Sequence, residues 1–344
     1  MLLEVGRIRS LAEAVLVKYG APETHAKTQV DLLLEAELRG YASHGLLRLR
    51  RIVERMANGV TDASSTGRHD WLGRNYLSVD GGRGLGPVVA MSALDAILPR
   101  AREDGVAIAA VNNSNHIGML AWYGEKIAAR GIILIAATTS EALVHPWGGR
   151  KAMVGTNPLA IAIPAEPEPL VLDMATGLVS MGKIHDHANR GEAIPLGWAL
   201  DAQGEPTTDA VAAKAGAIAP FGGAKGYALG LALEVLVTSL SAAAIGNNVT
   251  GTLDSNTVCN KGDIFIAIAP KQGEAAKRLV SCYLDEIRAS EPATPGQPVS
   301  VPGDRARRTR DRAVAGGLNL DDGLWRDLLA LEQSDPKIKK ASVS

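Results

Sequence analysis

The pattern of apolar residues changes at about residue 69, and this change limits the possible folds more than any other feature. Residues 1–68 carry apolar side chains at helical spacing, as in Val30, Leu33 and Leu34. Farther along, short aliphatic runs alternate with Gly, Asn and Pro, which predicts strands and turns. The expected strands are 77–79, 106–111, 132–137, 159–163, 170–172 and 263–269. Helices are expected at 87–104, 120–129, 225–240 and 274–289. The sequence therefore predicts a mixed α/β or α+β fold.

The two ends of the chain are expected to form one helical domain. Residues 291–302 contain four prolines, which predicts a loop that leaves the core. After this loop we expect a charged turn from Arg305 and an apolar helix at 324–331 that docks on the N-terminal helices. The predicted domains are a helical domain and an α/β core. The helical domain is 1–68 completed by 297–344, and the core is 69–296.

Composition excludes several classes of function. The chain has 344 residues, 46% of them hydrophobic, which is enough for a large core. Its 36 Lys and Arg nearly balance 37 Asp and Glu, so no positive field attracts nucleic acid or acidic membranes. The longest apolar runs fall far short of the roughly 20 residues that cross a bilayer. We therefore expect neither a nucleic-acid partner nor a membrane span.

The cysteines and the N-terminus predict a cytoplasmic location. Cys259 and Cys282 are the two cysteines, and they form no C-x-x-C pair, which argues against a disulfide framework and a zinc site. Glu4 and Arg7 interrupt the start of the chain, so it lacks the apolar core of a signal peptide.

A glycine-rich loop at 81–86 follows a predicted strand and suggests a phosphate-binding loop of the Rossmann type. However, its spacing is G-x-G-x-G, and the strand at 106–111 ends in asparagines instead of the acid that holds a ribose. We therefore favour a tight turn before a helix that begins at Pro87.

Ser43, His44 and Arg48 form the first candidate site. We expect Ser43 to cap the helix that follows, and His44 and Arg48 to lie on one helical face at i and i+4. An imidazole can exchange a proton with an alcohol or carbonyl oxygen, and a guanidinium can bind a carboxylate. The alternative is a solvated basic helix, because three more arginines follow Arg48.

Polar loops after the strands supply further candidates. His116 lies in a polar cluster directly after strand 106–111 and is a second acid/base candidate, unless it only satisfies turn backbone groups. Thr138, Thr139 and Ser140 follow the next strand in the same way and could hold the polar edge of a cofactor. Lys225 begins a long helix, where its charge opposes the helix dipole, so an anion-binding role explains its position well.

No metal site is predicted. His185 and His187 alternate on a short segment that we expect to be extended, and no further ligands accompany them. Cys259 lies near Lys261 but has no adjacent histidine to act as its base, so we expect a buried or turn cysteine.

Taken in order, the motifs resemble the type 2 malate/L-lactate dehydrogenase family over nearly the whole chain. The motifs are SHG with Arg48, NSNHIG, TTS before PWGG, GTNP, DMAT, GEPTTD, PFGGAKGYALG and KGDIFIAI. The resemblance implies a non-Rossmann nicotinamide-binding α/β domain with a mixed sheet, flanked by a helical domain from both chain ends. It also implies a homodimer or a larger homo-oligomer.

The resemblance also implies roles for individual residues. His44 and His116 match the acid/base candidates, and which of them moves the proton stays open. Arg48 matches the arginine that binds the substrate carboxylate, and Ser43 and Asn115 are expected to contact the substrate as well. The positions that match the cofactor cleft are Ser140, Thr156, Asp173, Met174, Ala175, Thr176, Lys183, Lys225, Gly303, Asp304 and Arg305.

Together these features predict hydride transfer between NAD or NADP and a small anionic carboxylate. The substrate would be a 2-oxo or 2-hydroxy acid of the malate, lactate or sulfolactate type, and Ile52, where many relatives have tyrosine, leaves its identity open. The alternatives are NADPH-dependent reduction of a cyclic imine-2-carboxylate, and a sensor that binds NAD(P) or a carboxylate without turnover. The choice between NAD and NADP stays open because Arg150, Lys151 and the arginines of 305–310 could hold a 2′-phosphate or be solvated.

Overall fold

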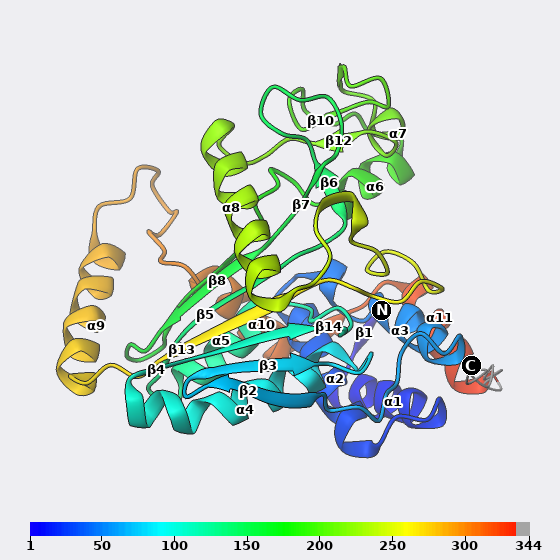
Figure 1. The fold of residues 1–344 in the computed structure, drawn as a ribbon. Coiled ribbons are helices and arrows are strands. Elements are labelled where there is room, and N and C mark those ends of the chain that lie inside the picture. The colour runs from blue at the N-terminus through cyan, green and yellow to red at the C-terminus, as the bar shows by residue number, and fades with distance from the viewer. Residues whose placement is uncertain (335–344) are drawn as a thin grey trace.

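A seven-stranded mixed sheet forms the centre of the protein in the computed structural model, which describes residues 1–334 (Figure 1). The strands in spatial order are β2 (Arg68–Gly73), β3 (Tyr76–Asp80), β4 (Val106–Asn112), β13 (Asp263–Ile268), β5 (Ile133–Thr138), β8 (Leu159–Ile163) and β9 (Leu170–Met174). Only β3 and β4 run parallel to each other, and all other neighbours in this sheet are antiparallel. The predicted mixed α/β class is confirmed.

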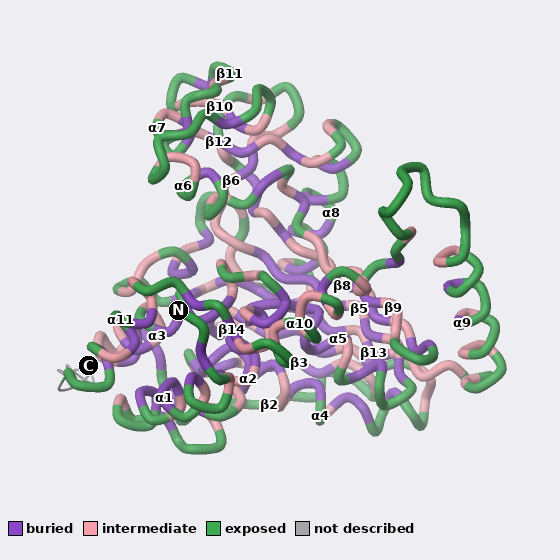
Figure 2. The backbone as a smooth tube through the Cα atoms, turned by 180° about the vertical axis from the view of Figure 1, so that it is seen from behind, coloured by how far each residue is buried: buried purple, intermediate pink, exposed green. Residues whose placement is uncertain are grey.

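Alternating small and branched side chains let helices pack closely on both faces of this sheet. Ala110, Ala137 and Ile264 are buried with residues of α8 (Ala224–Ser241) on one face. Their neighbours, among them Phe265, face α4 (Gly86–Asp104) and α5 (Leu120–Ala128) on the other face (Figure 1). Helix α9 (Gly273–Ala289) follows β13 and is largely exposed, together with the loop after it (Figure 2).

The helices from the two chain ends lie side by side. The N-terminal helices are α1 (Val5–Lys18), α2 (Glu23–Leu38) and α3 (Arg48–Ala57), and the C-terminal ones are α10 (Asp304–Gly316) and α11 (Asp322–Gln333). Helix α11 contacts α1 and α3, while α10 contacts α2. The short strands β1 (Leu2–Leu3) and β14 (Leu318–Asn319) pair the two ends directly (Figure 1). One set of buried side chains continues from these helices into the sheet, and the domain limits at 68 and 297 stay a prediction.

A second, smaller sheet carries a core of its own, which the sequence analysis did not separate. Its strands in spatial order are β11 (Pro206–Thr207), β10 (Ala199–Leu200), β12 (Ala217–Ile218), β6 (Ala142–Val144) and β7 (Val154–Gly155). With α6 (Met181–Arg190) and α7 (Ala210–Ala213) it encloses a cluster that includes Val144, Ile184 and Ile218. We call this unit the small lobe; it stands above the main sheet in Figure 1.

The carboxylate of Glu234 connects α8 to the base of the small lobe. This buried side chain accepts hydrogen bonds from the backbone N–H of Gly155 at 2.9 Å and of Gly246 at 2.6 Å, and from Nδ2 of Asn157 at 2.6 Å. Since unpaired buried donors are costly, this acid fixes β7 and the 3₁₀ turn Gly246–Asn248 against α8.

Most predicted elements agree with the structure to within two residues, but the secondary structure predicted for two segments is wrong. The segment from Arg305 is not a turn but the helix α10. His185 and His187 lie in α6 instead of an extended piece. The glycine loop is the tight turn we expected, with Pro87 in the first turn of α4. No helix within residues 1–334 is long and apolar enough to cross a membrane.

Candidate active site

Three polar segments meet at one end of the main sheet. Strand β13 runs antiparallel between β4 and β5, so its first residue lies beside the last residues of both neighbours. Asp263 is paired in register with Val111 of β4 and with Thr138 of β5. The segments that follow β4 and β5 and the segment that precedes β13 therefore converge there.

Asn115 holds the loop that carries His116. Its Oδ1 accepts hydrogen bonds from Nε of Arg55 at 3.0 Å and from Oγ1 of Thr61 at 3.1 Å. Its Nδ2 donates to the carbonyls of Arg83 at 2.7 Å and Gly84 at 2.8 Å. An asparagine amide has two donor hydrogens and two acceptor positions, and all four are used here. The protein itself occupies all four of these positions, and the substrate contact of Asn115 stays a prediction.

The sequence analysis missed Arg55, which ties this loop to α3. Besides Asn115, it donates from Nη1 to the carbonyl of Asp254 at 2.8 Å. Arg55 is buried in α3 together with Val53 and Met56, but helical spacing does not place it on their face, so no periodic pattern marked it. A Cβ at Gly86 would collide with the carbonyl of His116. The start of α4 therefore requires glycine where it packs against the loop that carries His116.

The loop also determines the tautomer of His116. The backbone N–H of Gly118 lies 3.1 Å from Nδ1 of His116 and donates to it. Nδ1 must then carry a lone pair, so the neutral ring has its proton on Nε2. Burial, followed by the charge of Arg48, holds the pKa of His116 well below its ordinary range.

His44 lies next to His116 in a 3₁₀ turn, Ala42–His44. The two ring centroids are 5.5 Å apart, and the planes are tilted by 31°. Oγ of Ser43 lies 3.0 Å from Nδ1 of His44, and a hydroxyl can donate or accept there. The predicted capping role of Ser43 is wrong, because α3 begins only at Arg48 and the hydroxyl binds the imidazole instead.

Arg48 places a half-buried positive charge beside the two imidazoles. Its Nε donates to the carbonyl of Ser43 at 2.8 Å, and no carboxylate within residues 1–334 forms an ion pair with it. Burial and the charge of Arg51 lower its pKa to about 10. The predicted i, i+4 pair on one helix is wrong, since His44 precedes α3, but Arg48 still acts on His44 through its charge. An unpaired, half-buried guanidinium suits a carboxylate ligand.

Three of the predicted cofactor residues line one cavity of about 340 Å³, namely Asp173, Gly303 and Arg305. The cavity lies between the end of β9, the start of α5 and the segment before α10. Oδ2 of Asp173 accepts the backbone N–H of Ala121 at 2.7 Å, and burial raises the pKa of Asp173 to about 6. A carboxylate that can accept ribose hydroxyls and a cation that can bind phosphate fit a dinucleotide here.

Ser140, Thr156 and Thr176 form a second group. Oγ of Ser140 accepts the backbone N–H of Thr156 at 2.9 Å and lies 3.2 Å from its Oγ1. The carbonyl of Thr156 accepts the N–H of Thr176 at 2.8 Å and its Oγ1 at 3.0 Å. Met174 and Ala175 connect this group along the chain to Asp173. The structure thus brings together the predicted cofactor residues from 140 to 176.

Neither Lys183 nor Lys225 lines the smaller cavity. Nζ of Lys183 is 4.8 Å from the ring centroid of Trp198 in the small lobe. The start of α6 nevertheless approaches the histidines, since a Cβ added at Gly182 would lie 3.7 Å from Cβ of Ser43. Lys225 is exposed in the first turn of α8.

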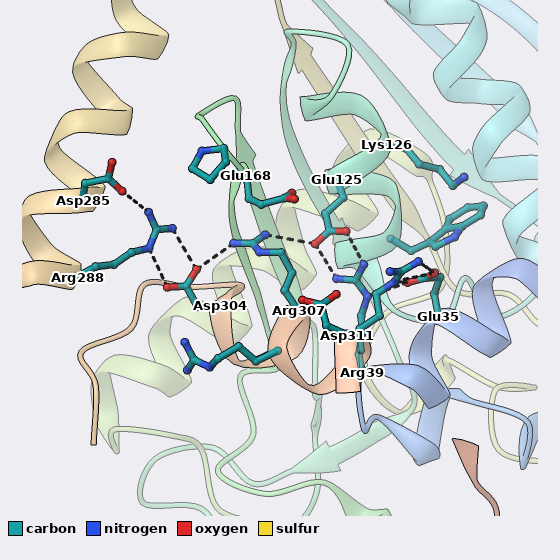
Figure 3. A pocket seen from close by; sticks show the side chains of 14 residues that line it. Glu35, Arg39, Glu125, Lys126, Glu168, Asp285, Arg288, Asp304, Arg307 and Asp311 are labelled. Carbon is teal, nitrogen blue, oxygen red and sulfur yellow. Dashed lines mark hydrogen bonds and ion pairs between the residues drawn. The ribbon is translucent and has the colours of Figure 1, made fainter. Parts of the chain in front are cut away.

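Asp304 does not face the smaller cavity. It accepts from Nε of Arg288 at 3.0 Å, from Nη2 of Arg307 at 3.3 Å and from the N–H of Val301 at 3.1 Å. These contacts place it in a larger cavity of about 610 Å³, where it ties α10 to α9 (Figure 3). Its carboxylate is held in ion pairs with Arg288 and Arg307, and its role in cofactor binding stays a prediction.

A row of alternating charges crosses the larger cavity from α9 to α2 (Figure 3). Arg307 continues from Asp304 to Glu125 at 3.4 Å, and Nη1 of Arg39 binds the same carboxylate at 2.6 Å. At the far end Nε of Arg310 lies 2.9 Å from Glu35. Among the arginines of 305–310, Arg307 and Arg310 are thus paired with carboxylates, whereas Arg305 borders the smaller cavity.

The remaining histidine and cysteine candidates do not form a further site. His185 and His187, two positions apart on α6, project in different directions, and Nδ1 of His187 is bound to the carbonyl of Ala193 at 3.1 Å. Cys259 is buried as expected, and burial raises the pKa of its thiol.

Known proteins match both the sequence and this structure. The family described as Malate/L-lactate dehydrogenase matches residues 3–329. The chain is 36% identical to the malate/(S)-sulfolactate dehydrogenase of Methanothermus fervidus over 95% of its length and 96% of that protein. It is 33% identical to a Delta(1)-pyrroline-2-carboxylate/Delta(1)-piperideine-2-carboxylate reductase of Pseudomonas aeruginosa, over 96% and 98% of the two chains. A dehydrogenase structure from Sinorhizobium meliloti superposes with a TM-score of 0.93 at 51% identity, over 96% and 98%.

With these matches, the fold and the site define an oxidoreductase that acts on hydroxy or oxo acids with NAD or NADP. The chain belongs to the malate/L-lactate dehydrogenase family, as its ordered motifs predicted.

The low pKa of His44 predicts how stability depends on pH. Burial, with the charge of Arg48 adding to it, lowers this pKa from 6.5 to about 4. Between these values the unfolded chain binds more protons, so the contribution of His44 to stability is complete above pH 6.5 and is lost as the pH falls toward 4. The free energy of unfolding of the wild type therefore falls between about pH 7 and pH 4.5, and we expect His44→Gln to remove about 2–3 kcal/mol of that fall.

Urea unfolding of wild type and variant at about pH 7 and about pH 4.5 measures the difference. His187→Gln, in the small lobe, is the control and is expected to keep the wild-type dependence. An identical dependence in wild type and His44→Gln would contradict a buried, neutral His44.

Proposed function

We propose that the protein transfers hydride reversibly between NAD(P)H and C2 of a small 2-oxo acid, forming a 2-hydroxy acid of the malate, lactate or sulfolactate type. The observation that carries this proposal is the half-buried Arg48, unpaired by any carboxylate of residues 1–334, beside the His44 and His116 rings. A substrate carboxylate supplies the missing negative charge. The neighbouring imidazoles then lie where the oxygen on C2 needs a proton.

The two histidines have different parts in this proposal. Hydride addition to C2 leaves an alkoxide, which must take a proton as its charge develops. His116 receives the Gly118 N–H on Nδ1, so it donates a hydrogen bond from Nε2 but resists a second proton. The Ser43 hydroxyl can accept from or donate to Nδ1 of His44, so it supports both charge states of that ring. We assign proton transfer to His44 and hydrogen bonding to His116.

Substrate binding itself prepares His44. The charge of Arg48 is one of the two causes of the low pKa of His44, and burial is the larger one. A bound carboxylate neutralises Arg48, so the pKa of His44 rises when substrate is present. In the reverse direction His44 accepts the proton of the hydroxyl as hydride leaves C2.

The cofactor would be held along the line from the smaller cavity to the Ser140 group. Asp173 would accept ribose hydroxyls, Arg305 would bind phosphate, and Ser140 and Thr156 would offer hydroxyls and amides to the other half. Lys225 is proposed as a further anion contact. When bound, the nicotinamide supplies or takes up the hydride.

Arg48→Ala tests the carboxylate contact. Loss of a charge-assisted, two-pronged bond costs about 3 kcal/mol, so kcat/KM for the oxo acid should fall about 100-fold, mainly through KM. Arg48→Lys should recover only part of this loss, because an ammonium cannot bind in a fork.

Arg50→Ala is the matched control, because this arginine lies on the same helix but is exposed and paired with Asp327 at 3.1 Å. It should keep kcat/KM within about twofold. Equal losses in the Arg48 and Arg50 variants would contradict the assigned role.

We further propose that the protein is a cytoplasmic homodimer. Helix α8 exposes four large apolar side chains, Leu229, Leu231, Val235 and Leu236, each 37–47% exposed. Exposed apolar patches of this kind mark interfaces between subunits. The two cysteines are unpaired, which suits a reducing compartment.

Sedimentation velocity tests the dimer. Wild type should sediment at twice the chain mass of 36.0 kDa, and Val235→Lys/Leu236→Lys should sediment as a monomer. Leu279→Lys, on the exposed face of α9, should leave the mass unchanged. A wild-type monomer, or a dimer that survives the double change on α8, would count against this interface.

A further inference from the structure

Three arginines of α3 form a row on one side of the helix. Arg48, Arg51 and Arg55 are spaced at i, i+3 and i+7, so their side chains leave the helix on the same face. No carboxylate within residues 1–334 forms an ion pair with any of them. Arg50, which points away from this row, does pair, with Asp327 at 3.1 Å. The row thus gathers three positive charges that the described chain does not balance.

These charges are costly where they lie. Arg48 and Arg51 stand in the first turn of α3, where a positive charge opposes the helix dipole, and this turn contains no acidic residue. Arg55 is only 5% exposed, and its Nη2 is buried without a hydrogen-bond partner in the part of the chain that the structure describes. A buried guanidinium without an opposite charge destabilises a fold. Stability therefore does not explain the row.

The row is anchored beside both imidazoles. Nε of Arg48 donates at 2.8 Å to the carbonyl of Ser43, the residue directly before the first histidine. Nε of Arg55 donates at 3.0 Å to Oδ1 of Asn115, the residue directly before the second histidine. Arg51 lies between these two anchors on the same helical face. The row therefore borders the place where the proposed reaction occurs.

Arg51 extends toward Arg48. Side chains of a helix lean toward its N-terminus and cover the preceding turn. Positions i and i+3 have Cβ atoms about 5–6 Å apart, so the half-buried Arg51 side chain lies along that of Arg48. In agreement with this placement, the charge of Arg51 is, after burial, the second cause that lowers the pKa of Arg48.

The substrate is a better source of the missing negative charge than the cofactor. The smaller cavity, where Asp173 and Arg305 are proposed to hold the cofactor, is lined by none of the three arginines. A substrate carboxylate bound by Arg48 balances one charge of the row. The charges of Arg51 and Arg55 stay unbalanced unless the substrate carries a second negative group.

We propose that Arg51 is a specificity-determining residue, which binds a second anionic group of the substrate and so selects 2-oxo acids with two negative charges over those with one. This group is a carboxylate or a sulfonate on the carbon next to C2, and the guanidinium of Arg51 donates hydrogen bonds to it. The fixed charge of Arg55 adds to the attraction. The inference rests on the proposed function, which it narrows to dianionic substrates.

Steady-state kinetics with oxaloacetate, sulfopyruvate and pyruvate tests the inference. Wild type should prefer one or both dianionic acids to pyruvate by about 30-fold in kcat/KM, as expected for one charge-assisted contact. The preferred acid distinguishes a carboxylate from a sulfonate. Arg51→Gln should lose this preference, mainly through KM, and should keep kcat/KM for pyruvate within about threefold of wild type.

Two further variants separate charge, geometry and position. Arg51→Lys keeps the charge but not the fork of donors, so it should keep part of the preference. Arg50→Gln removes an exposed arginine of the same helix and is the matched control. It should keep the wild-type preference.

A binding measurement tests the inference without turnover. With reduced cofactor present, no hydride can leave a hydroxy acid, so calorimetric titration with malate, sulfolactate and lactate reports binding alone. Wild type should bind malate or sulfolactate about 30-fold more tightly than lactate, whereas Arg51→Gln should bind all three about equally.

The inference is overturned if wild type shows no preference for dianionic acids in the titration, or if Arg51→Gln weakens both classes of acid equally. It is also overturned if this variant changes only the KM of the cofactor. Failure of the proposed function would look different. Wild type would then turn over no oxo acid, while the titration would still show a preference that depends on Arg51.

Discussion

Strand β13 runs antiparallel between β4 and β5, and the rest of the site depends on this placement. The strand returns from α8, far along the chain, and pairs residue by residue with both neighbours from Asp263 to Ile268. Its start therefore meets the ends of β4 and β5, which carry the His116 loop and the Ser140 segment. The antiparallel insertion thus explains why motifs more than a hundred residues apart in sequence act at one place.

The chemistry of the candidate active site comes from a positive charge that has no ion-pair partner in the described chain. Arg48 is half-buried without a carboxylate partner in the described chain, and the pKa values of the two imidazoles beside it are lowered by burial and by its charge. The nearby ion network around Arg39, Glu125 and Arg307 is the opposite case, because there each cation meets its acid. The contrast separates a site prepared for an anionic ligand from a network that joins helices α2, α5, α9 and α10.

The sequence predicted the main sheet because its strands are aliphatic runs between clear turn residues, as at 159–163. The small lobe was not predicted, because most of its strands are two residues long and carry no periodic pattern. Among site residues, the motifs pointed to His44, Arg48 and His116 together. The hydrogen bonds of Asn115 and Asp304 could not be predicted, because they are made with Arg55 and Arg288, whose contacts no local pattern reveals.

The central claim is that Arg48 and the two histidines serve hydride transfer to a 2-oxo acid. The most direct measurement follows the absorbance of NADH or NADPH with wild-type protein and a panel of oxaloacetate, pyruvate, sulfopyruvate, 2,3-diketogulonate and piperideine-2-carboxylate. Our account predicts oxidation of the reduced cofactor with at least one oxo acid, and none when the carboxylate of that acid is replaced by an amide. Turnover of the cyclic imine alone, or cofactor binding without any turnover, would contradict it.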